Sequence, residues 1–455
     1  MYLFYSSEVR QKAEQVMSTQ INSEYKPSKG QNSISFTHRI LRRLFRDYRE
    51  AFAIRLWNGS VLHIGDDASP TFTLGVMHPG VLRHLVLFRD PIRLAEAYFD
   101  GEVEVTGDFN AAMGLRYYLE NLRLPLHEKL LMACHALALG QQKIKSRPQQ
   151  QAVTKKSTHV TNQNNIESIA FHYDVSNEFY RLWLDDRMLY SCAYFETSEQ
   201  NLERAQCNKL DYICRKLRLQ ANENLLDIGC GWGALVCWAA KYYGVKAHGI
   251  TLSRNQYEYA CAEVKRLQLE DQVTIELRDY RDLPLAASYD KVSSIGMFEH
   301  VGLKNLSSYF STVHRVLKPG GLFLNHGITS DTAGWNQGVS TQFINRHVFP
   351  DGELDTVSNI QRRMEEANFE IFDVEGLRPH YALTLRHWVK RLEEQREEGV
   401  SLVGERTYRV WRLYMTGCAL QFEQGATGIY QILAERKKNG LPNLPLTRRD
   451  LYVND

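Results

Sequence analysis

The chain has 455 residues, of which 44% are hydrophobic and 24% are charged, and its formal net charge is +2. This length exceeds one ordinary core, so two or three domains are expected. The small net charge argues against a dedicated nucleic-acid binder, no apolar run is long enough to span a bilayer, and the 8 cysteines show no paired spacing, which favours reduced thiols.

The first 35 residues are polar, and the stretch from Tyr5 to Glu8 interrupts the apolar start before a secretory core can form, so we expect a cytoplasmic protein. Over residues 36–46, apolar side chains recur at helical spacing and arginines lie on the other side. This pattern predicts a basic amphipathic helix, which either lies on an anionic membrane or packs on its own domain. The apolar positions are Phe36, Ile40, Leu41, Leu44 and Phe45, and the basic ones are Arg39, Arg42, Arg43 and Arg46.

A small α+β domain is predicted next. Residues 53–64 read as a hairpin because Asn58-Gly59 favours a type I′ turn. Helices are expected over residues 91–101 and 108–122, and the apolar stretch 130–139 predicts a core helix or a segment that dips into lipid headgroups. Three basic residues follow that stretch, namely Lys143, Lys145 and Arg147.

Residues 149–165 are rich in Gln, Lys, Thr and Asn and predict a linker. The expected organisation is therefore an accessory α+β domain at residues 1–148, associated with lipid or membrane, then this linker, then a catalytic domain at residues 166–455.

Three glycines at alternate positions follow a short apolar run that contains one acid. Residues 225–228 resemble a buried parallel strand, and residues 234–243 follow helical periodicity. The acid is Asp227, and the glycines are Gly229, Gly231 and Gly233. Glycines allow a sharp turn and bring bare N–H groups up to a ligand at a helix N-terminus. This order suits S-adenosylmethionine (SAM), with Asp227 taking its ammonium group; a glycine-rich turn without a ligand is the alternative.

Predicted strands and helices alternate beyond this glycine loop. Strands are expected at 245–250, 273–277, 289–297 and from 323, and helices at 255–267 and 309–317, the last ending at Lys318-Pro319-Gly320-Gly321. Repeated βα units imply an α/β fold with a doubly wound, mostly parallel, Rossmann-like sheet whose ligands bind at the carboxyl ends of the strands. One crevice should then collect the loops after Ile228, Ile250, Leu277, Met297 and Leu324.

Several further motifs stand in order around the glycine loop. They are His172-Tyr173-Asp174, Tyr190-Ser191-Cys192, Gly249 to Ser253 with Gln256, Asp279-Tyr280-Arg281, Phe298 to Gly302, His326-Gly327-Ile328, Tyr381 with Thr384-Leu385, and Trp411 to Cys418. With the loop itself, they make the chain resemble the cyclopropane-fatty-acyl-phospholipid synthase family, which includes the mycolic acid methyltransferases. The resemblance covers roughly residues 166–440, and the N-terminal domain shares it only loosely.

The resemblance implies a SAM-dependent methyltransferase of class I fold that transfers the sulfonium methyl to the cis double bond of an unsaturated phospholipid acyl chain. Proton loss then closes a cyclopropane ring. Such chemistry must exclude water and tolerate a carbocation, which aromatic faces can ease, although any single aromatic is more often ordinary core. The implied cofactor contacts are Tyr190, Ser191, Asp227, Gly229, Gly231, Gly233, Thr251, Leu252, Gln256, Tyr280 and Arg281.

The resemblance also implies that a bound bicarbonate ion acts as the general base. It would be held by Cys192, Glu299, His326, Tyr381 and the backbone of Ile328, with Glu299 as the residue that orients it. If His326 is cationic or donates a hydrogen bond, it can hold the anion. We interpret Cys418 as a structural helix residue because the chemistry needs no covalent intermediate, and we expect no metal ion.

Two segments depart from the family pattern. Gly327 stands where Thr is usual, and the segment 349–355 lacks the customary proline after Leu354. The product is therefore open between a ring and a methyl or methylene branch, and a small-molecule methyltransferase or a non-catalytic lipid-binding protein on the same fold are further alternatives. The expected partner is a phospholipid surface at the inner face of the cell membrane, without nucleic acid, and a homodimer is left open.

Overall fold

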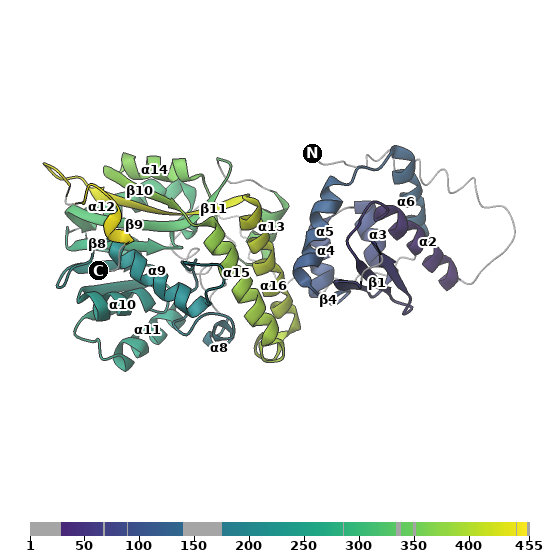
Figure 1. Cartoon of the computed structure of the whole chain (residues 1–455), viewed down its shortest axis with the longest axis horizontal. Coiled ribbons are helices and arrows are strands. Elements are labelled where there is room, and N and C mark those ends of the chain that lie inside the picture. The colour runs from purple at the N-terminus through teal and green to yellow at the C-terminus, as the bar shows by residue number, and fades with distance from the viewer. Residues whose placement is uncertain are drawn as a thin grey trace. The chain divides into compact units, whose positions relative to one another are not determined.

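The computed structural model describes residues 29–66, 69–88, 90–139, 175–284, 286–333, 338–348, 352–442 and 444–452. The chain divides into two compact units, Met1–Thr154 with Glu405–Arg409, and Lys155–Gly404 with Val410–Asp455 (Figure 1). The predicted linker at 149–165, the basic residues 143–147, the motif at 172–174 and residues 349–351 lie outside the described residues.

A four-stranded sheet of order β2-β1-β3-β4 organises the N-terminal unit. Its elements are α2 (Lys29–Leu44), β1 (Phe52–Leu56), β2 (Val61–Ile64), β3 (Phe72–Val76), α3 (Pro79–Phe88), α4 (Pro91–Phe99), β4 (Val103–Gly107), α5 (Phe109–Asn121) and α6 (Leu126–Ala138). The predicted hairpin is confirmed, because β1 and β2 pair antiparallel around Gly59, whose φ is +85°. The helices expected near 91–101 and 108–122 are confirmed as α4 and α5, which Asp90 and Asp108 cap.

The predicted basic helix is also confirmed, as α2. Its apolar residues Ile40, Leu41 and Leu44 are buried in the core of the unit, together with Met132 and Ala136 of α6. The apolar faces of both helices are therefore used for packing within the unit, and what α2 offers to a partner is charge. Among the described residues, no helix is both long enough and apolar enough to cross a bilayer.

A seven-stranded sheet of order β10-β11-β9-β8-β5-β6-β7 forms the second unit. The strands are β5 (Asn224–Ile228), β6 (Lys246–Thr251), β7 (Val273–Leu277), β8 (Tyr289–Ile295), β9 (Leu317–Ser330), β10 (Phe369–Gly376) and β11 (Thr427–Arg436). The helices are α8 (Asn177–Arg181), α9 (Leu202–Lys216), α10 (Ala234–Tyr243), α11 (Arg254–Arg266), α12 (Leu306–Val316), α13 (Val339–His347), α14 (Val357–Glu366), α15 (Arg378–Glu394) and α16 (Arg396–Gln424). Short 3-10 turns lie at Tyr280–Asp282, Phe298–His300, Leu303–Asn305 and Arg449–Leu451.

Helices cover both faces of this sheet, as predicted for a doubly wound fold. Leu225 of β5 packs with α9, α10 and α11, whereas its neighbour Leu226 packs with α12 and α14 on the opposite face, since successive strand residues point to opposite sides. The strands from β5 to β9 are parallel, and β11 is antiparallel to both β9 and β10. The carboxyl ends of β5, β6, β8 and β9 therefore share one edge.

One predicted boundary is wrong. The stretch 318–321 was expected to end a helix before a strand starting at Phe323, but β9 already begins at Leu317. Leu317 faces Tyr289 and Leu322 faces Lys291, so the four residues 318–321 of β9 lie opposite the single residue Asp290 of β8. The Pro-Gly-Gly stretch is a bulge within the strand rather than a break before it.

Candidate active site

The glycine loop turns the chain from β5 into α10. Gly229, Gly231 and Gly233 have φ values of +81°, +56° and +86°, which L side chains rarely adopt. The N–H groups of Gly229 and Cys230 donate to the carbonyl of Ile250, and that of Gly233 donates to the carbonyl of Cys230. The expectation of bare N–H groups at all three glycines is therefore wrong for Gly229 and Gly233, whose N–H groups hold the loop itself together.

Each glycine has a different steric surrounding. A Cβ at Gly229 would lie 3.1 Å from the Met297 side chain, and one at Gly233 would lie 3.0 Å from Cβ of Ala260 on α11. A Cβ at Gly231 would meet no atom within 4 Å. Gly233 thus permits α10 to pack closely against α11, whereas Gly231 faces open space.

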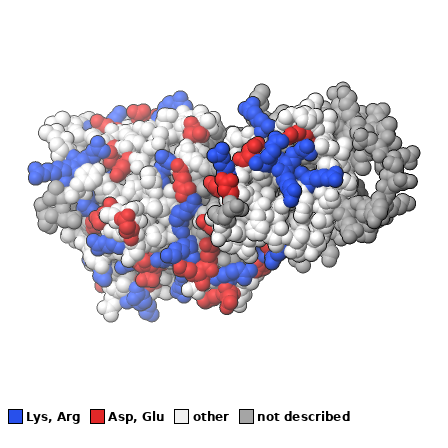
Figure 2. Space-filling model, turned by 45° about the vertical axis from the view of Figure 1, so that its right-hand side comes forward, with Lys and Arg blue, Asp and Glu red and all other residues white. Residues whose placement is uncertain are grey.

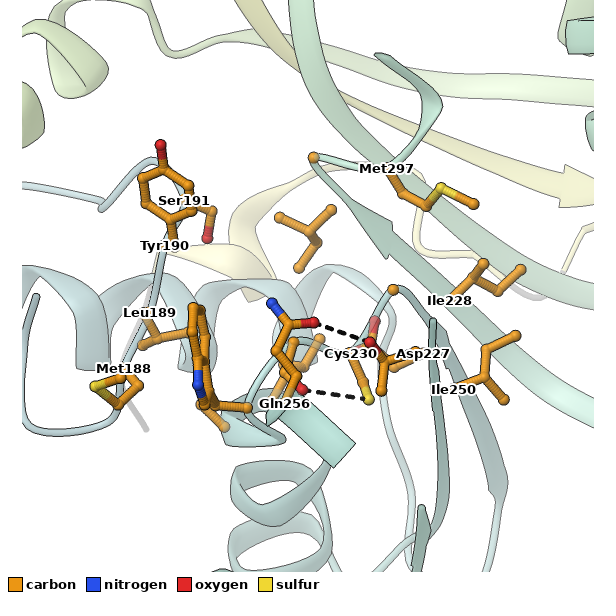
Figure 3. A pocket seen from close by; sticks show the side chains of 18 of the residues that line it. Met188, Leu189, Tyr190, Ser191, Asp227, Ile228, Cys230, Ile250, Gln256 and Met297 are labelled. Carbon is orange, nitrogen blue, oxygen red and sulfur yellow. Dashed lines mark hydrogen bonds between the residues drawn. The ribbon is translucent and has the colours of Figure 1, made fainter. Parts of the chain in front are cut away.

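That space is a cavity at the carboxyl edge of the sheet, here named the first cavity (Figure 3). Including its open mouth, it encloses about 1000 Å³. Nine of the eleven residues predicted to contact the cofactor line it, namely Tyr190, Ser191, Asp227, Gly229, Gly231, Thr251, Leu252, Gln256 and Tyr280. Gly233 and Arg281 do not line it. Residues that sequence reasoning missed include Lys209, Arg278, Met297 and His300.

Polar groups in the first cavity are fixed by their neighbours. The buried carboxylate of Asp227 accepts a 2.7 Å hydrogen bond from Ser293 Oγ. Burial raises the pKa of Asp227 to about 6, and the Ser293 bond and the Lys209 charge oppose that rise. Thr251 Oγ1 donates to Gln256 Oε1 at 2.8 Å, which leaves the Gln256 NH₂ group as a donor. The wall therefore presents both a carboxylate and an amide donor.

Arg281 is placed differently from the prediction. Its Nε donates to Asp279 Oδ1 at 2.9 Å, and its guanidinium lies 5.7 Å from the centre of the Tyr280 ring. The guanidinium of Arg281 is therefore bound within its own turn, and it does not line the first cavity.

A second cavity adjoins the first. All five residues of the predicted base site, Cys192, Glu299, His326, Ile328 and Tyr381, line it. Its wall also contains the apolar or weakly polar residues Ile344, Leu354, Tyr414, Cys418, Phe422 and Ile429, together with the polar Gln421 and Thr427. The two cavities share five wall residues, namely Tyr190, Ser191, Ile295, Gly296 and His300. A group transferred from the first cavity therefore has a short path into the second.

Glu299 lies on the turn that follows β8, and it is 7% exposed. Its Oε1 accepts a 2.7 Å hydrogen bond from the Ile328 N–H, so Ile328 orients Glu299 in this structure. Its Oε2 is buried and has no hydrogen-bond partner among the described residues. Burial raises the pKa of Glu299 to about 7, against the lowering effect of the Ile328 bond. In its ionised form, Glu299 therefore offers an unsatisfied acceptor, Oε2, in the wall of the second cavity.

His326 supplies the complementary donor. Burial, and then the charges of Lys209 and Lys216, lower its pKa to about 3, which favours the neutral imidazole and thus hydrogen-bond donation over a positive charge. Its Nδ1 lies 3.4 Å from Nε2 of Gln431; with that amide nitrogen as the donor, Nδ1 accepts and the imidazole hydrogen is on Nε2. That Nε2 is buried and without a partner among the described residues. His326 can therefore donate while neutral.

Cys192 is fully buried, and its thiol donates to the carbonyl of Ala193 at 3.3 Å. Burial raises its pKa, so the sulfur stays a thiol. Burial also raises the pKa of Cys418 to about 12, which removes a thiolate nucleophile there and agrees with its interpretation as a helix residue without covalent chemistry.

The aromatic residues divide into core and cavity wall. Trp183 and Trp388 are fully buried and pack edge to face at 5.5 Å, as expected of core residues. Tyr190, Tyr381 and Phe422 line the second cavity, with Tyr381 4.7 Å from the Phe422 ring. Aromatic residues thus line the same cavity as Glu299 and His326.

The two departures from the family pattern also lie here. Gly327 and Leu354 line the second cavity, and a Cβ at Gly327 would overlap the Phe298 ring. Because the ring occupies that space, no larger residue fits at Gly327 without moving Phe298.

The chain is similar in sequence to proteins that act on fatty acyl chains. A family model described as "Mycolic acid cyclopropane synthetase" matches residues 160–432. The chain is 41% identical, over 88% of its length and 95% of the relative's, to a probable fatty acid methyltransferase of Pseudomonas putida. It is 39% identical, over 59% of its length and 68% of the relative's, to the cyclopropane-fatty-acyl-phospholipid synthase of Escherichia coli (strain K12).

A solved structure resembles the second unit in fold. The mycolic acid cyclopropane synthase CmaA1, complexed with SAH and CTAB, aligns with a TM-score of 0.56 at 33% identity and covers 59% of this chain and 98% of its own.

Proposed function

This chain belongs to the mycolic acid cyclopropane synthetase family, and from that premise we propose that it is a cyclopropane-fatty-acyl-phospholipid synthase that uses bicarbonate. It is a SAM-dependent methyltransferase that transfers a methyl group, or forms a cyclopropane, on fatty acids. Beyond that activity, we propose the phospholipid substrate, the use of bicarbonate and the roles of individual residues.

The observation that carries the proposal is the adjacency of the two cavities. The first combines an open position at Gly231 with the buried carboxylate of Asp227 and the donor amide of Gln256, which fit the amino acid and nucleoside of SAM. When bound, SAM supplies an electrophilic methyl group. Tyr190 and Ser191, shared by both walls, then stand between the methyl donor and an acyl chain in the second cavity.

The second cavity fits a small anion. The unsatisfied Glu299 Oε2 can accept the O–H of bicarbonate, and the unsatisfied His326 Nε2–H can donate to one of its oxygens. Tyr381 and the thiol of Cys192 complete the set. Bicarbonate held there would supply a base of moderate strength. Ile328 contributes by fixing Glu299, rather than by a contact of its own N–H with the anion.

The remaining residues shape the reaction. An alkene is a weak nucleophile and attacks only a reactive methyl donor. Water would compete for the same donor and must therefore be excluded from the site. The apolar side chains of Ile344, Leu354 and Ile429 in the wall favour that exclusion. The methyl carbon of bound SAM would bond one alkene carbon as its S–CH₃ bond breaks and S-adenosylhomocysteine departs with that electron pair. Positive charge would then develop on the neighbouring alkene carbon, where aromatic residues such as Tyr381 and Phe422 would ease it. Transfer of one proton of the added methyl group to a base in the second cavity would release the C–H electron pair, which would form the bond between the methyl carbon and the cationic carbon and close the ring.

The substrate class is tested by incubating purified protein and SAM with vesicles of unsaturated phospholipid, and separately with the free fatty acid. We expect production of S-adenosylhomocysteine (SAH) with the phospholipid and little with the free acid. Equal or faster turnover of the free acid would contradict the phospholipid assignment.

We further propose that the protein works peripherally at the inner face of the cell membrane. Arg39 and Arg42 of α2, and Arg46 in the turn that follows it, are exposed, although Arg46 also contacts Glu128 at 3.1 Å. Figure 2 shows Lys and Arg side chains gathered on the N-terminal unit. Basic residues near anionic headgroups contribute about 1 kcal/mol each.

Reversal of these three charges, as Arg39→Glu, Arg42→Glu and Arg46→Glu, should weaken sedimentation with anionic vesicles and make it less dependent on salt. A matched variant reverses three exposed charges of the second unit, Arg266, Arg363 and Lys390, and should bind vesicles like wild type. An equal loss of vesicle binding in both variants, or no loss in either, would contradict a role of these arginines in membrane binding.

A further inference from the structure

Lys209 is a buried cation in the wall of the first cavity. It lies on α9, its side chain is 0% exposed, and it lines the cavity together with Asp227. A buried ammonium is costly unless hydrogen bonds or opposite charges compensate for its lost hydration. The contacts of the Lys209 ammonium group therefore show how its charge is compensated and which of its hydrogens are left to bind a ligand.

The ammonium of Lys209 is bound to Ser191. Its Nζ donates to Ser191 Oγ at 2.7 Å. Because an ammonium has no acceptor, Ser191 must accept this bond, and its own hydroxyl hydrogen points elsewhere. One turn earlier on α9, Gln206 Nε2 donates to the carbonyls of Leu189 and Ser191 at 3.3 and 3.1 Å. A single turn of α9 thus fixes the shared wall of the two cavities and turns Ser191 into a directed donor.

Two buried carboxylates lie near Lys209. Asp185 is already used within its own turn, where it accepts the N–H groups of Leu189 and Arg187 at 2.8 and 3.1 Å. Asp227 lines the cavity. Burial lowers the pKa of Lys209 to about 8, against the effect of these groups, so the ammonium form predominates at pH 7. The first cavity therefore carries a positive and a negative group on one wall.

We propose that Lys209 and Ser191 bind the carboxylate of the amino-acid end of SAM, while Asp227 binds its ammonium group. The inference rests on the proposed placement of SAM in the first cavity. The amino-acid end is a zwitterion, and the wall offers a cation and an anion to match it. The remaining N–H groups of Lys209 and the hydroxyl hydrogen of Ser191 are donors suited to a carboxylate, and charge-assisted bonds of this kind are among the strongest.

The test compares two ligands by calorimetry at pH 7. SAH carries the carboxylate, whereas decarboxylated SAH lacks it and keeps the ammonium group. Lys209→Met, which has a similar length and no charge, should weaken SAH binding about 10- to 100-fold and leave decarboxylated SAH unchanged. Ser191→Ala should show the same selectivity with a smaller loss. Asp227→Asn should weaken both ligands.

Lys216 offers a matched control on the same helix. It is also 0% exposed, but it pairs with Asp373 at 3.3 Å and with Glu375, and it does not line the cavity. Lys216→Met should lower Tm and leave SAH affinity unchanged.

The inference is overturned if Lys209→Met or Ser191→Ala binds SAH as wild type does, or if either loses decarboxylated SAH equally. Failure of the wild-type protein to bind SAH at all would instead contradict the cofactor site of the proposed function.

Discussion

Glu299→Gln is expected to lower turnover by about 100-fold or more while the affinity for SAM changes little. Gln keeps the acceptor for the Ile328 N–H, but it replaces the unsatisfied Oε2 with an amide that donates. An amide donor opposes the O–H of bicarbonate, so the anion loses its orientation, and a lost general base costs about 10²- to 10⁴-fold. Single-turnover methyl transfer and SAH calorimetry measure the two effects separately.

Glu353→Gln is the matched control. Glu353 also accepts a backbone N–H, that of Leu303 at 2.8 Å, but it does not line the second cavity. It should retain turnover. Wild-type activity should also fall in buffers stripped of carbon dioxide and recover when bicarbonate is added. If a depleted enzyme keeps its full rate while Glu299→Gln is inactive, bicarbonate is not the base and Glu299 itself takes the proton.

Gly231→Val is expected to abolish SAM binding, with a loss of at least about 2 kcal/mol. The added side chain would project into the open space of the first cavity, and a β-branched residue is strained at φ +56°. Calorimetry with SAH measures the loss directly. Unchanged affinity would contradict the assignment of the loop to the cofactor.

Gly440→Val is a control that separates backbone strain at a positive φ from blocking of the first cavity by the added side chain. Gly440 has a φ of +90° and open space around its Cβ position, but it does not line the first cavity. The two variants should lose comparable stability, as measured by Tm, and only Gly231→Val should lose the ligand.

The parallel part of the fold could be predicted because each βα unit has a local signature. Buried strands such as 225–228 are short apolar runs, and helices such as 234–243 have clear periodicity, so both match the structure within one residue. The last two strands, β10 and β11, were not predicted. The bulge at 318–321 was also missed, because Pro-Gly-Gly in isolation resembles a loop and only the pairing with β8 shows that the strand continues through it.

The candidate site was predicted largely from the family resemblance. A sequence motif does not record which side chains become buried or which partners they find, and the errors in the prediction arise there. The sequence places Arg281 in a cofactor motif, but its guanidinium is drawn to Asp279 two residues earlier. Lys209 was missed because a lysine on an amphipathic helix normally indicates the solvated face. Its burial depends on the packing of α9 against the segment 189–192, which no local pattern records. The neutral state of His326 likewise follows from burial in the sheet.

The most direct test of the central claim is mass spectrometry of phospholipids from cells that express the protein, paired with a chemical test for remaining double bonds. A cyclopropane synthase predicts acyl chains that gain one methylene unit and no longer react as alkenes, and the change should be absent with Glu299→Gln. Acyl chains that gain the same mass but still react as alkenes would indicate a methylene branch, and would contradict ring closure as the outcome at this site.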